Sequence, residues 1–363
     1  MILTFTYLLL FLVLFLMELL YFRIADKYNI IDKPNERSSH STVVLRGGGV
    51  LFTLAVIVWV FYQLLFGRHA SMTGAELVWN YLPFIIGLVM VSTVSFVDDV
   101  VGTSNKTRLI VQFVSAALLW FGVMPYCYGD CSGGALCYAS AALLSAWVVI
   151  ASVGTMNVYN FMDGINGITG AYSLSVLVSL LVLNECVLPD RFIVPSLLAC
   201  ELLAVVIFCY FNFRPKGKAK CFAGDVGSVS IAFILLFAEI KLICATGDWC
   251  WIVFLAVYGV DGCLTICHRI MLHEKLGQAH RKHAYQIMAN ELKISPLKIS
   301  GLYMTLQLVI NMVMIYVIPD TFIAHVCYLV GILVVLSVAY ILFMRKYYHL
   351  HAEYLKALEK NVN

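Results

Sequence analysis

Long apolar segments alternate with short polar ones along almost the whole chain. Each apolar segment has about the 20 residues that an α-helix needs to cross the hydrocarbon core of a bilayer. The pattern therefore predicts an all-α polytopic integral membrane protein with about eleven transmembrane helices. They fall at roughly residues 2–22, 48–66, 80–97, 109–125, 138–159, 168–184, 192–211, 227–245, 249–267, 300–318 and 322–344.

The first apolar segment is expected to remain in the protein as a helix. No basic residue precedes it, no small-residue cleavage site follows it, and it is too long for the apolar core of a signal peptide. We interpret residues 1–363 as a single polytopic domain that ends in a tail at 345–363.

The composition agrees with a membrane protein. Of 363 residues, 62% are hydrophobic and only 12% are charged, and the mean hydropathy is +0.90. A soluble domain carries about twice that charged fraction, which excludes the soluble classes. The net charge of +3 is too small to indicate a nucleic-acid partner. The sequence is compatible with a homodimer but does not determine the oligomeric state.

The distribution of positive charge predicts the orientation in the membrane. Of the 24 Lys and Arg residues, 21 fall in segments that follow odd-numbered spans. Basic residues mark cytoplasmic loops, so we expect the N-terminus outside and the tail at 345–363 in the cytoplasm. The same count places four polar segments on the cytoplasmic side, where they indicate one site. They are residues 97–100, 157–167, 222–228 and 280–283.

Acidic residues at the ends of spans are candidates for chemistry, because a carboxylate beside lipid costs roughly 2.5–3.5 kcal/mol even on the mildest insertion scale. Asp98 and Asp99 end the third span. One can bind a cation while the other accepts a proton, or the pair can be a solvated helix end. Lys106 and Arg108 suit phosphate oxygens, although cytoplasmic anchoring explains them as well.

Residues 157–167 give the strongest single signal. Asn160 and Asp163 are three residues apart and share one face of a helix end. Asn166 adds an amide that can pair with a carbonyl-and-imide edge such as that of uracil. An Asx-rich turn would explain the glycines here but not two Asn and one Asp at the bilayer boundary.

Residues 222–228 indicate a loop that enters a helix. Asp225 lies near the first turn, where free N–H groups bind anions, and it can equally be an N-cap. Phe222 precedes it and can stack on a base. Lys216, Lys218 and Lys220 fit contacts with lipid headgroups as well as with substrate.

Two other cytoplasmic segments carry cations suited to phosphate. His280, Arg281 and His283 lie in the longest cytoplasmic loop. Zinc is the alternative there, but the ligand spacing is poor, which favours phosphate and sugar contacts. Arg46 is followed by three glycines, which suggests a close approach of backbone to phosphate.

Three cysteines, Cys127, Cys131 and Cys137, lie in one predicted outer loop. In an oxidising compartment two of them can pair, which leaves the third over.

With these motifs in place, the chain resembles the polyprenyl-phosphate N-acetylhexosamine-1-phosphate transferase superfamily, of the glycosyltransferase family 4 type. That superfamily includes the phospho-MurNAc-pentapeptide translocase. The patterns at 157–167 and 222–228 are specific in combination, and the run at 279–286 most resembles the O-antigen initiating branch. Two positions depart from the family pattern: Val44-Leu45 stands where many members carry Pro, and Gly102 stands where some carry a third acid.

The resemblance implies roles for the candidate residues. Asp225 would bind Mg²⁺, for which Mn²⁺ could substitute, with Asn160 beside the metal and the pyrophosphate. Phe222 would stack on uracil and Asn166 would read its edge. Asp98 and Asp99 would hold or deprotonate the lipid phosphate, Asp163 would support the site, and residues 280–283 would contact phosphate and sugar.

The implied reaction transfers N-acetylhexosamine 1-phosphate from a UDP-sugar to undecaprenyl phosphate, releases UMP and starts lipid-linked glycan assembly. The expected setting is the bacterial inner membrane, with the site facing the cytoplasm. A secondary transporter with buried carboxylates is the alternative from another class. A CDP-alcohol phosphotransferase would need a different continuation after Asp163-Gly164. Direct attack by the lipid phosphate is the favoured mechanism over a phosphorylated Asp98.

Overall fold

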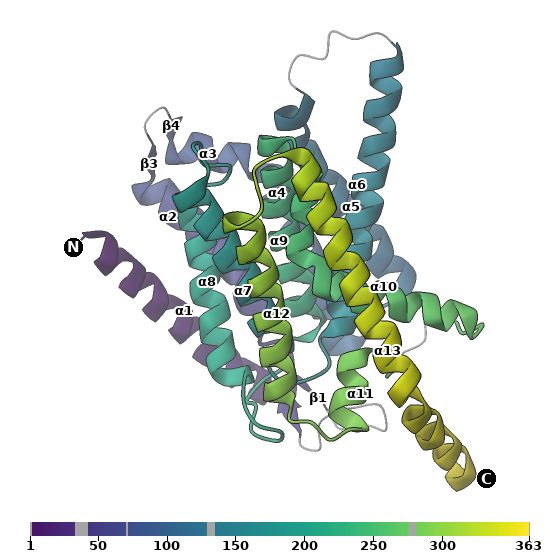
Figure 1. The fold of residues 1–363 in the computed structure, drawn as a ribbon. Helices are drawn as coiled ribbons and strands as arrows, with labels where there is room; N and C mark the ends of the chain where they lie inside the picture. Colours follow the sequence, from purple (N-terminus) through teal and green to yellow (C-terminus); the bar gives the residue numbers. More distant parts are fainter. Residues whose placement is uncertain (1, 33–42, 70–71, 129–134, 276–280, 363) are drawn as a thin grey trace.

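The computed structural model describes residues 2–32, 43–69, 72–128, 135–275 and 281–362 (Figure 1). Two short antiparallel strand pairs, β1–β2 (Ile31–Asp32 and Val44–Leu45) and β3–β4 (Arg68–His69 and Met72–Thr73), accompany a helical bundle. The helices are α1 (Ile2–Lys27), α2 (Val50–Phe66), α3 (Gly74–Asn80), α4 (Leu82–Val101), α5 (Asn105–Tyr128), α6 (Ala135–Met162), α7 (Ile168–Val182), α8 (Pro195–Asn212), α9 (Gly224–Thr246), α10 (Ala256–Met271), α11 (Ala284–Asn290), α12 (Pro296–Tyr316) and α13 (Phe322–Val362). A π-helical turn, Leu183–Val187, follows α7, and a 3₁₀ segment, Trp249–Leu255, leads into α10.

The predicted all-α polytopic fold is confirmed. Ten helical segments among the described residues are long and apolar enough to cross a membrane. The remaining expected span, at 48–66, corresponds to α2, which has only 17 residues. At 1.5 Å per residue it is about 26 Å long, a few ångströms less than a bilayer core. Its start is set by Gly49 and its end by Gly67, and one of its faces is buried against protein.

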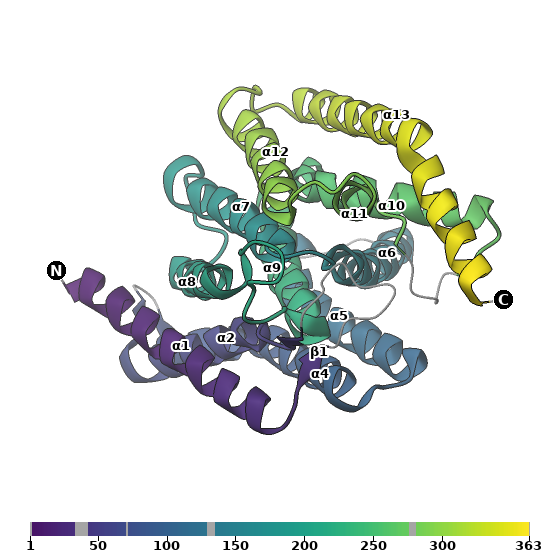
Figure 2. The same cartoon turned by 90° about the horizontal axis from the view of Figure 1, so that it is seen from below.

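Helix α9 is the centre of the bundle. Its side chains from Val226 to Leu242 are all buried. Seen along the bundle, α9 is surrounded by its neighbours, and it contacts α2, α4, α5, α6 and α7 (Figure 2). A helix that is apolar on every side needs such surroundings. The first turn of α9, which carries Asp225, is thereby fixed against several other helix ends.

One end of the bundle, where β1 and α11 lie, is called the site end (Figure 1). Helix α1 runs from the N-terminus down to this end, and α13 extends beyond it (Figure 1). Strand β2 reaches the loop before α9 here, because Leu45 forms a parallel bridge with Cys221. The Cβ of an alanine at Gly49 would lie 2.3 Å from the Gly227 Cα. Gly49 therefore allows close packing of α2 on α9, and an approach of this glycine run to phosphate stays a prediction.

The structure corrects the expected partner of Cys127, whereas a pairing of Cys131 with Cys137 stays a prediction. Cys127 forms a disulfide with Cys244, at a Cα–Cα distance of 4.7 Å. Cys131 and the side chain of Cys137 lie outside the described part of the chain. The physical reason is the packing of α5 against α9, which brings the end of α5 to the end of α9.

Candidate active site

Three carboxylates from two helix ends form what we call the carboxylate cluster: Asp98, Asp99 and Asp225. Asp99 joins the two helices, because its Oδ1 accepts a hydrogen bond from the backbone N–H of Asp225 and its Oδ2 accepts one from Val226, both at 3.0 Å. The end of α4 thus caps the N-terminal turn of α9, where free N–H groups favour negative charge. The Asp99 side chain is fully buried, which favours a positioning role over contact with substrate.

Asp98 is held by the turn that follows it. Its Oδ1 accepts hydrogen bonds from the backbone N–H and the hydroxyl of Thr103, at 2.6 and 2.7 Å. Gly102, with φ of +75°, makes this turn possible, since a left-handed backbone is favourable only for glycine. Gly102, which stands where the family pattern can carry a third acid, is thus needed here for its backbone conformation.

Two arginines neutralise the carboxylate cluster. Arg108 bridges Asp98 and Asp225 with two contacts of 2.8 Å each. Arg46 lies 2.7 Å from Asp99 and 3.5 Å from Asp225. Burial alone would lower the pKa of Arg46, but the charges of Asp99 and Asp225 outweigh it and raise this pKa. Three carboxylates and two guanidiniums leave one negative charge in the ionised cluster, which suits a cation.

The donor set fits Mg²⁺ if substrate completes its coordination. Asp98 and Asn160 both come within hydrogen-bonding reach of the Asp225 carboxylate, which gives an oxygen-rich site. Within the described ranges, no three His, Cys, Asp or Glu side chains converge closely enough to hold a metal by themselves. Mg²⁺ commonly binds one or two carboxylates together with substrate phosphates, so a site of this kind does not need a complete protein cage.

The loop that precedes Asp225 depends on glycine. Gly224 has φ of +71°, and a Cβ at this position would lie 2.5 Å from Oδ2 of Asp99. Phe222 is fixed through its backbone: its N–H donates to Leu45 at 2.8 Å, and its carbonyl accepts from Gly48 at 2.9 Å. The Phe222 ring is half-buried, and its stacking on a base stays a prediction.

The segment at 157–167 brings Asn160 and Asp163 to the site end. Asp163 accepts a hydrogen bond of 2.6 Å from the Thr169 hydroxyl on α7. Burial raises the pKa of Asp163 to about 7, and the charges of Asp225 and Asp99 add to the rise. The charges of the carboxylate cluster therefore act on Asp163.

Asn166 has a structural contact that the sequence did not indicate. Its amide nitrogen donates to the carbonyls of Arg214 and Pro215, at 2.8 and 3.2 Å, and so fastens the loop between α8 and α9. The Ser300 hydroxyl on α12 donates to the backbone carbonyl of Asn166 at 2.9 Å. The reading of uracil by Asn166 stays a prediction.

The contacts given for the other predicted cations are with groups outside the carboxylate cluster. Lys106 is exposed on the first turn of α5, and His280 lies outside the described residues. Arg281 contacts Glu291 at 3.4 Å and stacks over the Tyr354 ring. His283 is buried, 3.4 Å from Asp261.

Asp261 and Tyr285 tie the 281–285 segment to the site end. Asp261 accepts hydrogen bonds from the Tyr303 hydroxyl at 2.6 Å and from the backbone N–H of Ala284 at 3.0 Å, and so fixes the start of α11. The Tyr285 hydroxyl donates to the carbonyl of Phe161 at 2.8 Å, one residue after Asn160. Asp261, Tyr285 and Thr103 are not among the residues that the sequence analysis selected.

Comparison with known proteins gives a family match and several relatives. Residues 81–243 match the model of a family described as Glycosyl transferase family 4. A probable undecaprenyl-phosphate N-acetylglucosaminyl 1-phosphate transferase of Bacillus subtilis (strain 168) is 23% identical, over 72% of this chain and 70% of the relative. A phospho-N-acetylmuramoyl-pentapeptide-transferase of Streptococcus thermophilus (strain CNRZ 1066) is 25% identical, over 54% of this chain and 58% of the relative.

A third relative is a decaprenyl-phosphate N-acetylglucosaminephosphotransferase of Mycobacterium leprae (strain TN). It is 24% identical, over 60% of this chain and 55% of the relative. The chain thus spans little more than half the length of the streptococcal and mycobacterial relatives. The resemblance to the polyprenyl-phosphate N-acetylhexosamine-1-phosphate transferase superfamily, which the motifs predicted, is confirmed by these matches.

Proposed function

We propose that this multi-pass membrane protein transfers N-acetylhexosamine 1-phosphate from a UDP-sugar to polyprenyl phosphate and releases UMP. The observation that carries the proposal is the carboxylate cluster, which two arginines bridge at one end of a helical bundle. Such a set of groups can hold a cation and phosphate oxygens together. Two relatives, named for transfer of N-acetylglucosamine phosphate to undecaprenyl phosphate and to decaprenyl phosphate, support the same reaction.

In the proposed mechanism, Asp225 and the amide oxygen of Asn160 would hold Mg²⁺, with Mn²⁺ as a substitute. When bound, the ion supplies charge neutralisation of the pyrophosphate. Arg46 and Arg108 would orient phosphate oxygens, because a guanidinium presents paired donors that match phosphate geometry. Positioning and electrostatics contribute most of the rate in phosphoryl transfer.

Direct attack by the lipid phosphate is proposed over a phosphorylated Asp98. Both carboxylate oxygens of Asp98 already accept hydrogen bonds, one from Thr103 and the other from Arg108. Each such bond lowers the availability of an oxygen lone pair for attack on phosphorus. Asp98 is then a group that positions Arg108 and accepts a proton, and trapping of a phosphorylated Asp98 in a quenched half-reaction would overturn this assignment.

The proposed location is the bacterial inner membrane, with the site end in the cytoplasm. The support is the excess of Lys and Arg in the segments that belong to this end. We propose GlcNAc as the sugar, since two relatives are named for it. A role in O-antigen or other lipopolysaccharide assembly rests on the resemblance of the run at 279–286, which also leaves FucNAc and QuiNAc as candidate sugars.

The test is UMP release by purified protein in detergent with undecaprenyl phosphate, Mg²⁺ and a panel of UDP-N-acetylhexosamines. We expect release with one donor, abolished by EDTA and restored by Mg²⁺. Asp225→Asn should lower the rate by about 10²–10³-fold, the size of effect seen when a group that stabilises the transition state is removed. Asp190→Asn is the matched control, because Asp190 is exposed and lies in a loop before α8, outside the proposed site.

A secondary transporter is the second candidate, and buried carboxylates favour it. Glu201 on α8 and Glu239 on α9 are 0% and 2% exposed and lie within spans. A transporter would use such groups as proton carriers. The transferase assignment is wrong if two results are obtained together. Folded wild-type protein would release no UMP with any donor, and it would show proton-coupled uptake of a solute into vesicles that is lost in Glu239→Gln.

A further inference from the structure

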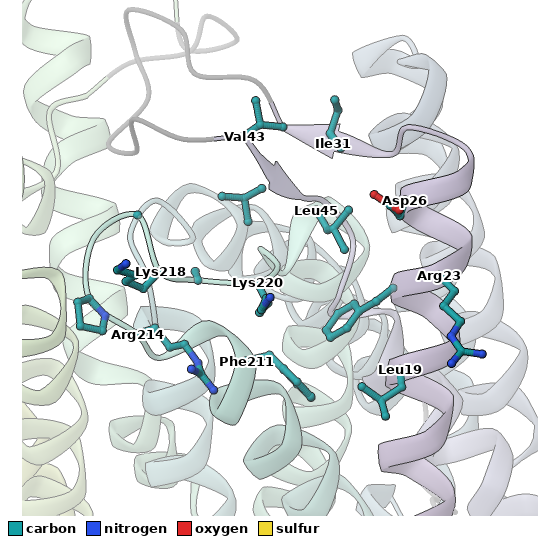
Figure 3. Close-up of a pocket in the computed structure, with 15 residues that line it drawn as sticks. Leu19, Arg23, Asp26, Ile31, Val43, Leu45, Phe211, Arg214, Lys218 and Lys220 are labelled. Carbon is teal, nitrogen blue, oxygen red and sulfur yellow. The ribbon is translucent and has the colours of Figure 1, made fainter.

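A second polar site lies on the other side of the loop that precedes α9. A cavity of about 1060 Å³ lies between α1, the end of α8, strand β2 and the 213–220 part of this loop (Figure 3). Its apolar walls include Leu19 and Phe22 from α1, Leu45 from β2 and Phe211 from α8. The transferase mechanism above uses none of these residues.

The charge in this cavity is strongly positive. Four cations line it, Arg23, Arg214, Lys218 and Lys220, against one acid, Asp26. Arg23 comes from α1 and the other three come from the α8–α9 loop, where Figure 3 shows Arg214, Lys218 and Lys220. The lining thus has a net charge of +3, whereas the ionised carboxylate cluster together with its two arginines has a net charge of −1. A cavity with this lining fits a ligand that combines a phosphate with apolar chains.

The cavity lies where a membrane lipid can reach it. Helix α1 exposes Leu12, Leu16 and Leu20, which are 51%, 55% and 57% exposed. Exposed leucines in a spanning helix face the acyl chains, and Arg23 follows them at the site end. Cations in such a position attract anionic headgroups, with an effect of about fivefold in affinity for each.

A phosphate in this cavity is separated from the carboxylate cluster by backbone. The Phe222 N–H donates to the Leu45 carbonyl at 2.8 Å, so β2 and the loop before α9 are joined between the two sites. Leu45 lines the cavity, while Arg46, the next residue, contacts Asp99. A lipid bound here would therefore contact the strand that precedes Arg46 without placing its phosphate for attack.

We propose that this cavity binds the headgroup of an anionic glycerophospholipid of the bilayer, with Lys218 and Lys220 as phosphate contacts and the α1 side chains against an acyl chain. The binding does not depend on the proposed transferase reaction. Neighbouring lysines differ in this proposal: Lys218 and Lys220 line the cavity, whereas Lys216 does not.

The test measures binding of phosphatidylglycerol and phosphatidylcholine to the delipidated full-length protein in detergent by native mass spectrometry. Wild type is expected to bind phosphatidylglycerol at least tenfold more tightly. The double variant Lys218→Gln with Lys220→Gln should lose roughly 25-fold in affinity, from about fivefold per cation. The matched control is Lys216→Gln with Lys346→Gln, which removes the same charge from exposed positions outside the cavity and should lose less than about threefold.

Two results would overturn the proposal. Equal losses in the two double variants would show diffuse attraction by surface charge instead of a site. Competition of undecaprenyl phosphate for the same site at equal or higher affinity would make the occupant the lipid substrate. UMP release at saturating substrates is expected to stay within twofold of wild type in the Lys218→Gln, Lys220→Gln protein, so a failed transferase assay and a failed lipid-binding assay are separate outcomes.

Discussion

At the scale of single residues, Arg108 is the side chain that holds the site together. It contacts Asp98 and Asp225, which come from different helices and would otherwise repel each other. Its planar guanidinium can donate to two carboxylates at once, while a lysine ammonium is a compact point charge on a flexible stem. The identity of this residue therefore matters beyond its charge.

We expect Arg108→Lys to lower kcat/KM by at least tenfold, because one of the two bridges is lost in a site where a single donor contributes about 10²–10³-fold. The measurement is UMP release at varied UDP-sugar, with thermal unfolding as the check on folding. Arg345→Lys, at an exposed position on α13, is the matched control. Unchanged kinetics in Arg108→Lys would show that only the positive charge is needed.

At the scale of the elements, the turn between α4 and α5 decides where Asp98 points. Gly102 ends α4 with a left-handed backbone, and its N–H donates to the Asp98 carbonyl at 3.0 Å. A Cβ at Gly102 would meet nothing within 4 Å. The requirement for glycine is thus one of backbone conformation alone, which makes the position a clean test.

Gly102→Ala is expected to destabilise the protein by about 1–2 kcal/mol, the cost of a left-handed conformation for a residue with a Cβ. Thermal unfolding in detergent, followed by circular dichroism, measures it. Gly154→Ala is the control, because Gly154 lies within helix α6 and is also open around its Cβ. That variant should be neutral or stabilising by up to about 1 kcal/mol, and equal losses in both would contradict the backbone explanation.

At the scale of the whole molecule, the end of the bundle opposite the site is joined by Asp248 and His325. Asp248 accepts a hydrogen bond of 2.8 Å from the Cys250 N–H at the start of the 3₁₀ segment, and it pairs with His325 on α13. Burial alone would raise the pKa of Asp248. The hydrogen bonds from His325 and Cys250 outweigh it and hold this pKa below its ordinary value of 3.8.

A lowered carboxylate pKa stabilises the fold above the ordinary value of 3.8 and loses its effect as the pH falls through the lower, folded-state pKa. We therefore expect Asp248→Asn to be less stable than wild type by about 1 kcal/mol at pH 6, with the difference shrinking below pH 4. Asparagine caps as well as aspartate, so the variant isolates the charge. A constant difference from pH 6 to pH 3 would contradict the assignment.

The sequence by itself determined the membrane-spanning architecture and the positions of the acidic motifs. Both depend on local properties. An apolar segment of about 20 residues forms a helix in lipid because every backbone polar group must be paired internally. A carboxylate at the end of such a helix is costly whatever the fold of the rest of the chain. Asp98, Asp99 and Asp225 could be chosen on these grounds, and α2 differs from its expected span only in being a few residues shorter.

Only the tertiary structure decided which cations meet these acids. Arg46 is more than fifty residues from Asp99 in the sequence and still contacts it, whereas Arg281 turns to Glu291 and Tyr354. The local sequence does not distinguish an arginine that will contact these acids from one that will not, because each is a flexible cation in a polar loop. The partner depends on the contact between β2 and the loop before α9, and the same contact creates the cavity beside Lys218 and Lys220. Long-range packing fixes these pairings, and residue type and spacing alone do not.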